Sequence, residues 1–236
     1  MSIARHVRSA LLAASTFALS GTAAWAASEP GWYYGLNGGR AHADLTKSEL
    51  DLDANSLIAT AGPPLTSSST LADDDTSWSI FFGYQFSPYF AFEAGYLNLG
   101  SFPYRYAGTA DLTGFGGASV APTTVDFALD FKGYPLSAIG ILPIGPVFDL
   151  HARAGILMTN AKQEFTSSAG TARLGFSDSA SSQDLFYGAG AAMNLGDTWS
   201  VSVDWVKYDK VGDGDTIAET DLDALSLSLI YRFGPF

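Results

Sequence analysis

The sequence contains no cysteine, which excludes a disulfide scaffold, a thiol nucleophile and any cysteine-ligated metal site. Charged residues make up only 15% of its 236 residues, against about 25% in an ordinary soluble domain. Lys and Arg number 12 against 24 Asp and Glu, so the formal net charge is −12. This deficit of basic residues argues against nucleic acid as a partner, because binding it requires clustered Lys and Arg.

Aromatic residues and glycine are plentiful, with 16 Phe, 11 Tyr, 5 Trp and 25 Gly. The chain starts with Arg5 and Arg8, continues with an apolar stretch at 10–19, and has small residues at Ala24 and Ala26. These features predict a secretory signal peptide at 1–26 and a mature, exported domain at 27–236. Beyond it, no stretch is apolar over the roughly 20 residues that a membrane helix requires.

Alternation of side chains with a period of two residues dominates the mature chain, which is typical of β-strands with two different faces. In 125–132, we expect the apolar set at Val125, Phe127, Leu129 and Phe131 to face outward and Asp126, Asp130 and Lys132 to face inward. For 184–194, the pattern does not indicate which residues face inward, because both sets are small or apolar over 186–192. Prolines fall outside or at the ends of these segments, as ladder hydrogen bonding demands. Eight strands are predicted, at 32–43, 78–86, 90–98, 125–132, 148–158, 184–194, 199–206 and 225–233.

The connections between these strands alternate in length. Tight turns are expected at 87–89 and 195–198 and a short link at 137–146, whereas long polar loops are expected at 45–76, 100–122, 160–183 and 209–221. This organisation predicts an all-β fold, an eight-stranded antiparallel up-and-down transmembrane β-barrel with short periplasmic turns and long extracellular loops. A soluble sandwich is the alternative, but its second face would carry dense charge, which is missing here.

Several segments resemble the transmembrane domain of the outer-membrane protein A (OmpA) family, in family order along nearly the whole mature chain. They are 31–35, 82–89, 92–100, 133–135, 153–155, 211–213 and 225–234. The resemblance implies a barrel in the outer membrane of a Gram-negative bacterium, surrounded by its lipids and lipopolysaccharide. Because the sequence stops at Phe236, we expect the barrel without the peptidoglycan-binding domain that family members often carry. Leu229, Tyr231 and Phe233 resemble the signal read by the barrel-assembly machinery.

Charged residues on the inward parity are expected to meet inside the barrel, because a buried charge is costly unless it is paired. The residues assigned to this lumen charge network are Glu93, Lys132, His151, Arg153, Asp204 and Arg232, with Asp130 and Asp149 also inward. In the OmpA family, a similar Glu–Lys–Arg cluster is discussed as the gate of a narrow pore. The alternative is that these charges only fill and stabilise the lumen.

The remaining chemistry-bearing residues are few. His42, beside Asp44, and His151 are the mature chain's two histidines, and neither has a pattern typical of catalysis, so we expect no enzyme activity, no metal and no cofactor. Acidic residues in 45–76 and 209–221 are expected to be solvated, with divalent cations shared with lipopolysaccharide as the alternative. The loops are where host or phage surface ligands would bind.

The sequence therefore predicts a structural, surface-exposed role: outer-membrane integrity, a surface antigen or adhesion. The alternative is a porin-like, narrow gated channel for small solutes. Lateral transport of hydrophobic molecules and a lipid-modifying enzyme are weaker alternatives.

Overall fold

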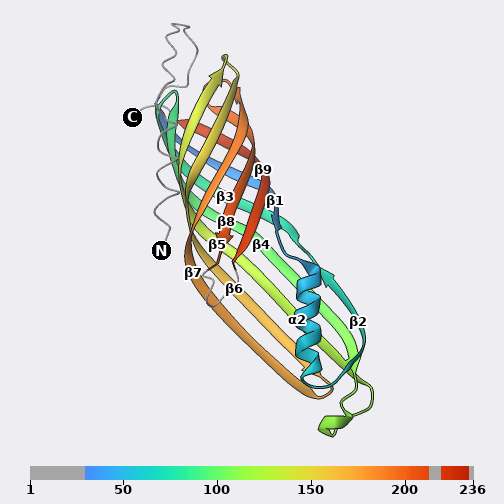
Figure 1. Ribbon diagram of the computed structural model, residues 1–236. Helices are drawn as coiled ribbons and strands as arrows, with labels where there is room; N and C mark the ends of the chain where they lie inside the picture. Colours follow the sequence, from blue (N-terminus) through green and yellow to red (C-terminus); the bar gives the residue numbers. More distant parts are fainter. Residues whose placement is uncertain (1–29, 213–218, 234–236) are drawn as a thin grey trace, which may run out of the picture.

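The computed structural model describes residues 30–212 and 219–233 (Figure 1). The predicted signal peptide lies outside these residues and stays a prediction. None of the helices in the described ranges has the length and apolar character that a membrane crossing requires. In chain order, the elements are β1 (Gly31–Ala43), α2 (Lys47–Ala59), β2 (Pro64–Leu71), β3 (Asp74–Ser87), β4 (Phe90–Ala110), η1 (Thr113–Phe115), β5 (Ala121–Ile144), β6 (Phe148–Ala169), β7 (Ala172–Leu195), β8 (Trp199–Val211) and β9 (Thr220–Phe233).

Eight of these strands form a closed antiparallel ring, in the order β1, β3, β4, β5, β6, β7, β8, β9 and back to β1. Closure satisfies the backbone hydrogen bonds without an edge, which is what a membrane-spanning sheet requires. β2 lies outside the ring and extends it, because it pairs with β4 beyond the residues that pair with β3. The predicted eight-stranded barrel is confirmed.

The outer face of the ring carries a belt of exposed apolar side chains, which would be unfavourable in water and is expected in lipid. All eight ring strands contribute to the belt, which begins at the short periplasmic turns. Examples of its residues are Trp32, Leu36, Ile80, Phe82, Phe92, Leu136, Leu150, Ile156, Leu185, Met193, Val203, Trp205, Leu227 and Leu229. Aromatic rings stack within this belt, among them Trp32 on Phe82, with ring centroids 4.8 Å apart.

The extracellular connections are long, as predicted, but three of the four are ordered rather than irregular. α2 and β2 lie within 45–76, and extensions of β4 and β5 occupy most of 100–122. β6 and β7 continue through 160–183 and are joined only at Gly170 and Thr171. Part of the fourth connection, 209–221, lies outside the described residues. The prediction of irregular loops was wrong in these three ranges. Their side chains are polar on both faces, a pattern that is typical of loops. A strand surrounded by water can also be polar on both faces, because hydrogen bonds to the neighbouring strands are enough to hold its conformation.

The strands also run through the predicted link at 137–146, since β5 ends at Ile144 and the turn follows at 145–147. The expectation that prolines lie outside strands or at their ends is wrong at Pro103 in β4 and at Pro135 in β5, whereas Pro122 and Pro143 lie next to the terminal residues of β5. Pro135 is accommodated at a gap in the ladder to β4, between the pairs Leu97–Gly133 and Ala94–Leu136. Its missing N–H therefore falls in the short stretch where the ladder to β4 is interrupted.

Beyond the belt, five strands continue as one curved sheet on the extracellular side (Figure 1). We call it the extracellular sheet: β2 with 103–110 of β4, 121–130 of β5, 162–169 of β6 and 172–184 of β7. α2 packs on its inner face, where Ala54 and Ile58, one helical turn apart, are buried against a cluster that includes Tyr106 and Val125.

Candidate functional site

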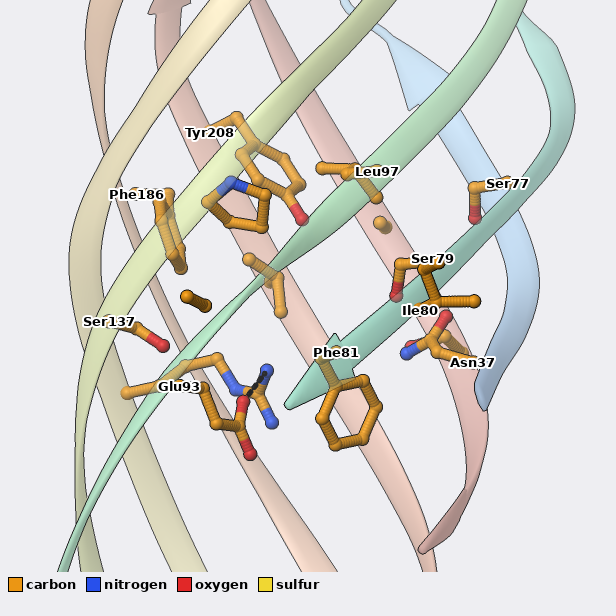
Figure 2. A pocket seen from close by; sticks show the side chains of 16 residues that line it. Asn37, Ser77, Ser79, Ile80, Phe81, Glu93, Leu97, Ser137, Phe186 and Tyr208 are labelled. Carbon is orange, nitrogen blue, oxygen red and sulfur yellow. Dashed lines mark hydrogen bonds and ion pairs between the residues drawn. The ribbon is translucent and has the colours of Figure 1, made fainter. Parts of the chain in front are cut away.

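Four of the residues assigned to the lumen network meet inside the barrel, and we call them the lumen charge cluster: Glu93, His151, Arg153 and Asp204. Arg153, on β6, donates to Glu93 Oε2 on β4 at 3.3 Å and to Asp204 Oδ1 on β8 at 2.9 Å. His151 Nε2 lies 2.6 Å from the same Asp204 oxygen. Two carboxylates on opposite walls are thus joined across the lumen by one guanidinium, as Figure 2 shows for Glu93.

Three further residues complete this cluster and were not predicted. Tyr33 on β1 donates its hydroxyl to Glu93 Oε1 at 3.0 Å. Ser202 and Ser228 donate to Asp204 Oδ2 at 2.6 and 3.3 Å. Parity contained the signal for Tyr33, because it alternates with outward-facing Trp32 and Tyr34. The two serines lie on the inward parity of β8 and β9, where small polar residues gave no reason to select them.

Lys132 is not part of the network, and this prediction was wrong. Lys132 is exposed on the outer face of β5. Asp130 lies on the same face and is half-buried, whereas Leu129 and Phe131 point inward and are buried. The parity of β5 is therefore the reverse of the one expected. The physical reason is that the lumen at this height is apolar and the outer surface is in water, so the apolar set of 125–132 faces inward.

Arg232 does point inward, but it belongs to a second polar group nearer the periplasmic end. It donates to Asn194 Oδ1 at 3.0 Å and also contacts the Ser200 hydroxyl. Asn194 in turn donates to Asp149 Oδ2 at 2.6 Å. These contacts also settle the unassigned face of 184–194: even-numbered residues of β7 point inward, with Phe186 and Ala192 buried.

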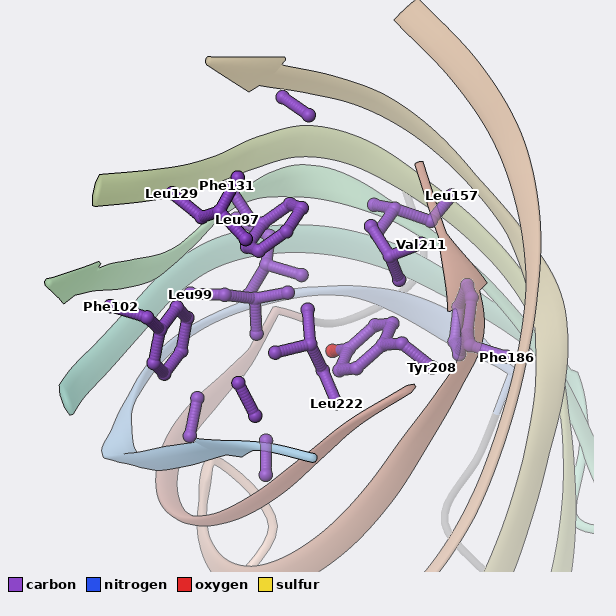
Figure 3. Packing of buried hydrophobic residues seen from close by; sticks show 14 of the residues in the cluster. Leu97, Leu99, Phe102, Leu129, Phe131, Leu157, Phe186, Tyr208, Val211 and Leu222 are labelled. Atoms are coloured by element: carbon purple, nitrogen blue, oxygen red, sulfur yellow. The ribbon is translucent and has the colours of Figure 1, made fainter. Parts of the chain in front are cut away.

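Directly beyond the charge cluster, apolar side chains from opposite walls fill the lumen (Figure 3). On β4, the charged residue Glu93 is followed by Leu97 and Leu99; on β8, Asp204 is followed by Val206 and Tyr208. We call the whole set the lumen apolar cluster, and its largest fully buried members are Leu99, Phe102, Leu129, Phe131, Leu157, Val211 and Leu222. Two successive layers of side chains, one ionic and one apolar, thus cross the barrel.

The lumen holds two small cavities, one on each side of Arg153. The first, of about 40 Å³, is lined by residues of both clusters, including Asn37, Glu93, Phe186 and Tyr208 (Figure 2). The second, of about 50 Å³, lies on the side of Arg232 and Asp149. Each has room for a few water molecules, and neither has the several hundred Å³ of a small-molecule site.

On the extracellular side, Asp51 holds α2 against the sheet. Its carboxylate accepts hydrogen bonds from Lys47 Nζ and from the Tyr104 hydroxyl, both at 2.7 Å, and from Ser69 of β2. The Lys47 hydrogen bond is the main reason that the pKa of Asp51 falls to about 2. Asn55, one turn later, accepts from Tyr106 at 2.9 Å.

A groove of about 370 Å³ lies beside this contact, across β2, β4, β5 and β6. Its lining includes a row of directly paired residues, Leu71, Tyr104, Phe127 and Phe165. At the rim of the barrel, His42 lies near Asp73 and Asp74, with Nδ1 3.3 Å from Asp74 Oδ1 rather than beside Asp44 as expected. These three residues are half exposed, and their ligand atoms lie within 4.8 Å of one another.

The predicted assembly signal lies on the lipid side of β9. Leu229 is 46% exposed, and Tyr231 and Phe233 contact the ring of Tyr34 with centroids 5.3 and 5.9 Å away. This placement leaves the three side chains accessible from the membrane, and their role in assembly stays a prediction.

Residues 27–235 match the OmpA-like transmembrane domain. The chain belongs to this family. It is 27% identical over 183 residues to outer membrane protein A of Yersinia pseudotuberculosis, covering 77% of this chain and 45% of that protein. For outer membrane protein A of Serratia marcescens, the values are 29% over 162 residues, 68% and 40%. The chain thus spans less than half the length of these OmpA relatives.

Among solved structures, the attachment invasion locus protein Ail of Yersinia pestis, in complex with a heparin analogue, is 15% identical with a TM-score of 0.44. It aligns over 87% of this OmpA-family chain and 99% of its own. Neisserial surface protein A is also 15% identical, with a TM-score of 0.45 and coverage of 86% and 97%. The chain is an OmpA-like β-barrel of the outer membrane.

Proposed function

We propose that this OmpA-family barrel is a closed structural element of the outer membrane that displays an ordered surface for recognition outside the cell. The observation that carries the proposal is the lumen apolar cluster, which lies across the barrel directly beyond the paired charges. An ion crossing it would lose its hydration without meeting polar partners, and this costs far more than thermal energy. The geometry therefore favours outer-membrane integrity over a gated channel for small solutes.

The surface part of the proposal is supported by the extracellular sheet and α2. Charged and hydrogen-bonded contacts hold α2 in one position, so the barrel presents a defined surface to host cells or phage. Arg40 and Lys132 are exposed on the outer face just beyond the apolar belt, where they are suited to lipopolysaccharide phosphates. Within the described residues, His42 and His151 make their side-chain contacts with the carboxylates of Asp74 and Asp204, an arrangement that agrees with a non-catalytic role.

Two measurements test this proposal. Purified protein reconstituted into planar lipid bilayers is expected to give no single-channel steps, and a deletion strain is expected to admit large antibiotics that the complemented strain excludes. Reproducible conductance steps that disappear when Phe131 is enlarged to Trp would contradict closure. An unchanged permeability barrier in the deletion strain would contradict the role in membrane integrity.

A further inference from the structure

The extracellular sheet is open, and one of its two edges is a long, regular strand without a partner in the described part of the chain. β7 pairs with β6 along its whole length, from Ala169–Ala172 to Phe148–Met193, without a register shift. On its other side, β7 pairs with β8 only from Leu185 onward. Among the described residues, 172–183 therefore have backbone N–H and C=O groups without a strand partner on this side, whereas the buried Asp184 carboxylate accepts a hydrogen bond from the Gly212 N–H that follows β8.

The opposite edge, β2, is blunted in the ways that natural proteins use against unwanted strand pairing. It begins with Pro64, has a register irregularity between Pro64 and Thr66, and is only eight residues long. Its Ser69 is also tied to α2 through Lys47 and Asp51. Residues 172–184 contain no proline, and their ladder to β6 has no bulge, so charge at Arg173, Asp178 and Asp184 is the feature that limits pairing along this edge.

Side chains along this edge form two distinct faces. On the inner face, Leu174 and Phe176 are 59% and 46% exposed, and Phe176 stacks on Phe165 with ring centroids 4.8 Å apart. On the outer face, Ser177, Ser179 and Ser181 alternate as exposed small polar residues. An added strand would thus find apolar neighbours at Leu174 and Phe176, near the β6–β7 turn. Farther along the same face it would meet Asp178, Ser182 and Asp184, which are polar or charged.

We propose that residues 172–184 of β7 bind an extended polypeptide segment of another protein by antiparallel strand addition, with apolar residues of the segment beside Leu174 and Phe176. Only an extended polypeptide matches the alternating donors and acceptors of a strand edge. This inference rests on the proposed surface role and names the chemistry of its partner.

A second copy in the same membrane does not fit this site. Copies in one membrane are related by rotation about the membrane normal, so β7 runs from outside to periplasm in both. With the strand tilt of about 35–45° typical of such barrels, two copies of β7 can cross at no more than about 90° and cannot become antiparallel. The partner strand therefore comes from outside the membrane.

The test uses the folded protein in lipid nanodiscs and a peptide with the sequence of residues 160–169, which pairs with β7 on its other side. At millimolar peptide, amide hydrogen exchange measured by NMR is expected to slow about tenfold at alternate residues of 173–183 and not in β2. A control peptide with proline at the positions of Gln163, Phe165 and Ser167 is expected to have no effect. The variant Phe176→Lys should weaken peptide binding about tenfold, whereas Leu52→Lys on exposed α2 should not.

Absence of protection in β7 at millimolar peptide would overturn the proposal, as would equal protection by the proline peptide or protection confined to β2. Protection of 173–183 that rises with the number of barrels per nanodisc, without peptide, would identify a second copy instead and also overturn it. Gel mobility of unboiled Phe176→Lys protein reports whether the variant is folded. Conductance and permeability are independent of this edge, so failure here and failure of the proposed membrane role are distinguishable.

Discussion

Replacement of Arg153 by alanine should strongly destabilise the barrel, whereas the same replacement at Lys132 should not. Arg153 is mostly buried between Glu93 and Asp204, but Lys132 is exposed on the outer face. At an effective dielectric constant of about 20, charges 2.9 and 3.3 Å apart attract by about 6 and 5 kcal/mol. Desolvation of the three ions offsets much of this attraction, so the intact cluster contributes far less to stability than these figures.

Removal of Arg153 alone leaves two buried carboxylates without their cation, and such broken pairs typically cost about 3–5 kcal/mol. For Lys132→Ala, the expected change in the free energy of unfolding is within about 0.5 kcal/mol, as for an exposed residue outside any network. The assay is urea unfolding of the protein refolded in lipid vesicles, followed by tryptophan fluorescence and by the mobility of unboiled samples on gels.

A third variant separates charge from packing. Arg153→Met combined with Glu93→Gln and Asp204→Asn removes all three charges, and it should recover part of the stability lost in Arg153→Ala. Equal losses for Arg153→Ala and Lys132→Ala would refute the reversed parity of β5. A loss below about 1 kcal/mol for Arg153→Ala would refute the argument that this guanidinium is needed to keep two carboxylates buried.

Three further predictions follow from the same structure. Phe131→Ala in the lumen apolar cluster should lower the free energy of unfolding by about 3–5 kcal/mol because it leaves a cavity; a loss no larger than that of exposed Phe92→Ala in the same urea assay would contradict the inward placement. Gly100 has φ +99°, and an added Cβ would lie 2.6 Å from Asp75 Oδ2, so Gly100→Ala should cost about 1–3 kcal/mol. Gly38→Ala, with open space around its Cβ, is the matched control, and similar costs would contradict the strain. Because the pKa of Asp51 is lowered from 3.8 to about 2, its contribution to α2 docking is present above about pH 4 and is lost as the pH falls toward 2. Hydrogen exchange of α2 amides should follow this pH dependence in the wild type and not in Asp51→Asn, and identical profiles would argue against the carboxylate contacts.

Periodicity in the sequence was sufficient to predict the ring and much of the charge cluster. On β3 and β8, outward residues such as Trp78, Phe82 and Trp205 are large and apolar because they face lipid, so parity assigned both faces correctly. On β4 and β6, Glu93 and Arg153 could then be predicted to point inward, because they alternate with the outward apolar residues of the same strands. Their mutual contact could not be derived from spacing, because it depends on how strands from opposite walls face one another across the lumen.

The extracellular part was harder to predict because water surrounds it on several sides. Residues 160–183 are rich in Ser, Thr and charged side chains, a composition shared by loops and solvated strands. What keeps them in strand conformation is the unbroken β6–β7 ladder, a pairing property that composition does not encode. The same applies to 45–76, where the docking of α2 depends on Tyr104 and Tyr106 of a strand about 50 residues later.

The wrong prediction at Lys132 has a cause that is visible in the sequence of β5: the apolar residues change from one face of the strand to the other along its length. On β5, outward positions change from Asp130 and Lys132 to Tyr134 and Leu136, while inward positions change from Leu129 and Phe131 to Gly133 and Ser137. No bulge separates the two parts in the ladder to β6, so the side chains keep their faces and only the surroundings change, from water to lipid outside and from apolar to polar inside.

The same inversion occurs on β8 and β9. On β8, outward Trp205 is followed by Lys207 and inward Asp204 by Val206; on β9, outward Asp223 precedes Leu225 and inward Leu222 precedes Ser226. A strand that crosses from membrane to water while its lumen changes from polar to apolar must exchange the parity of its apolar residues at that point. The inversion therefore marks the extracellular boundary of the membrane, and period-two analysis should be applied separately on each side of it.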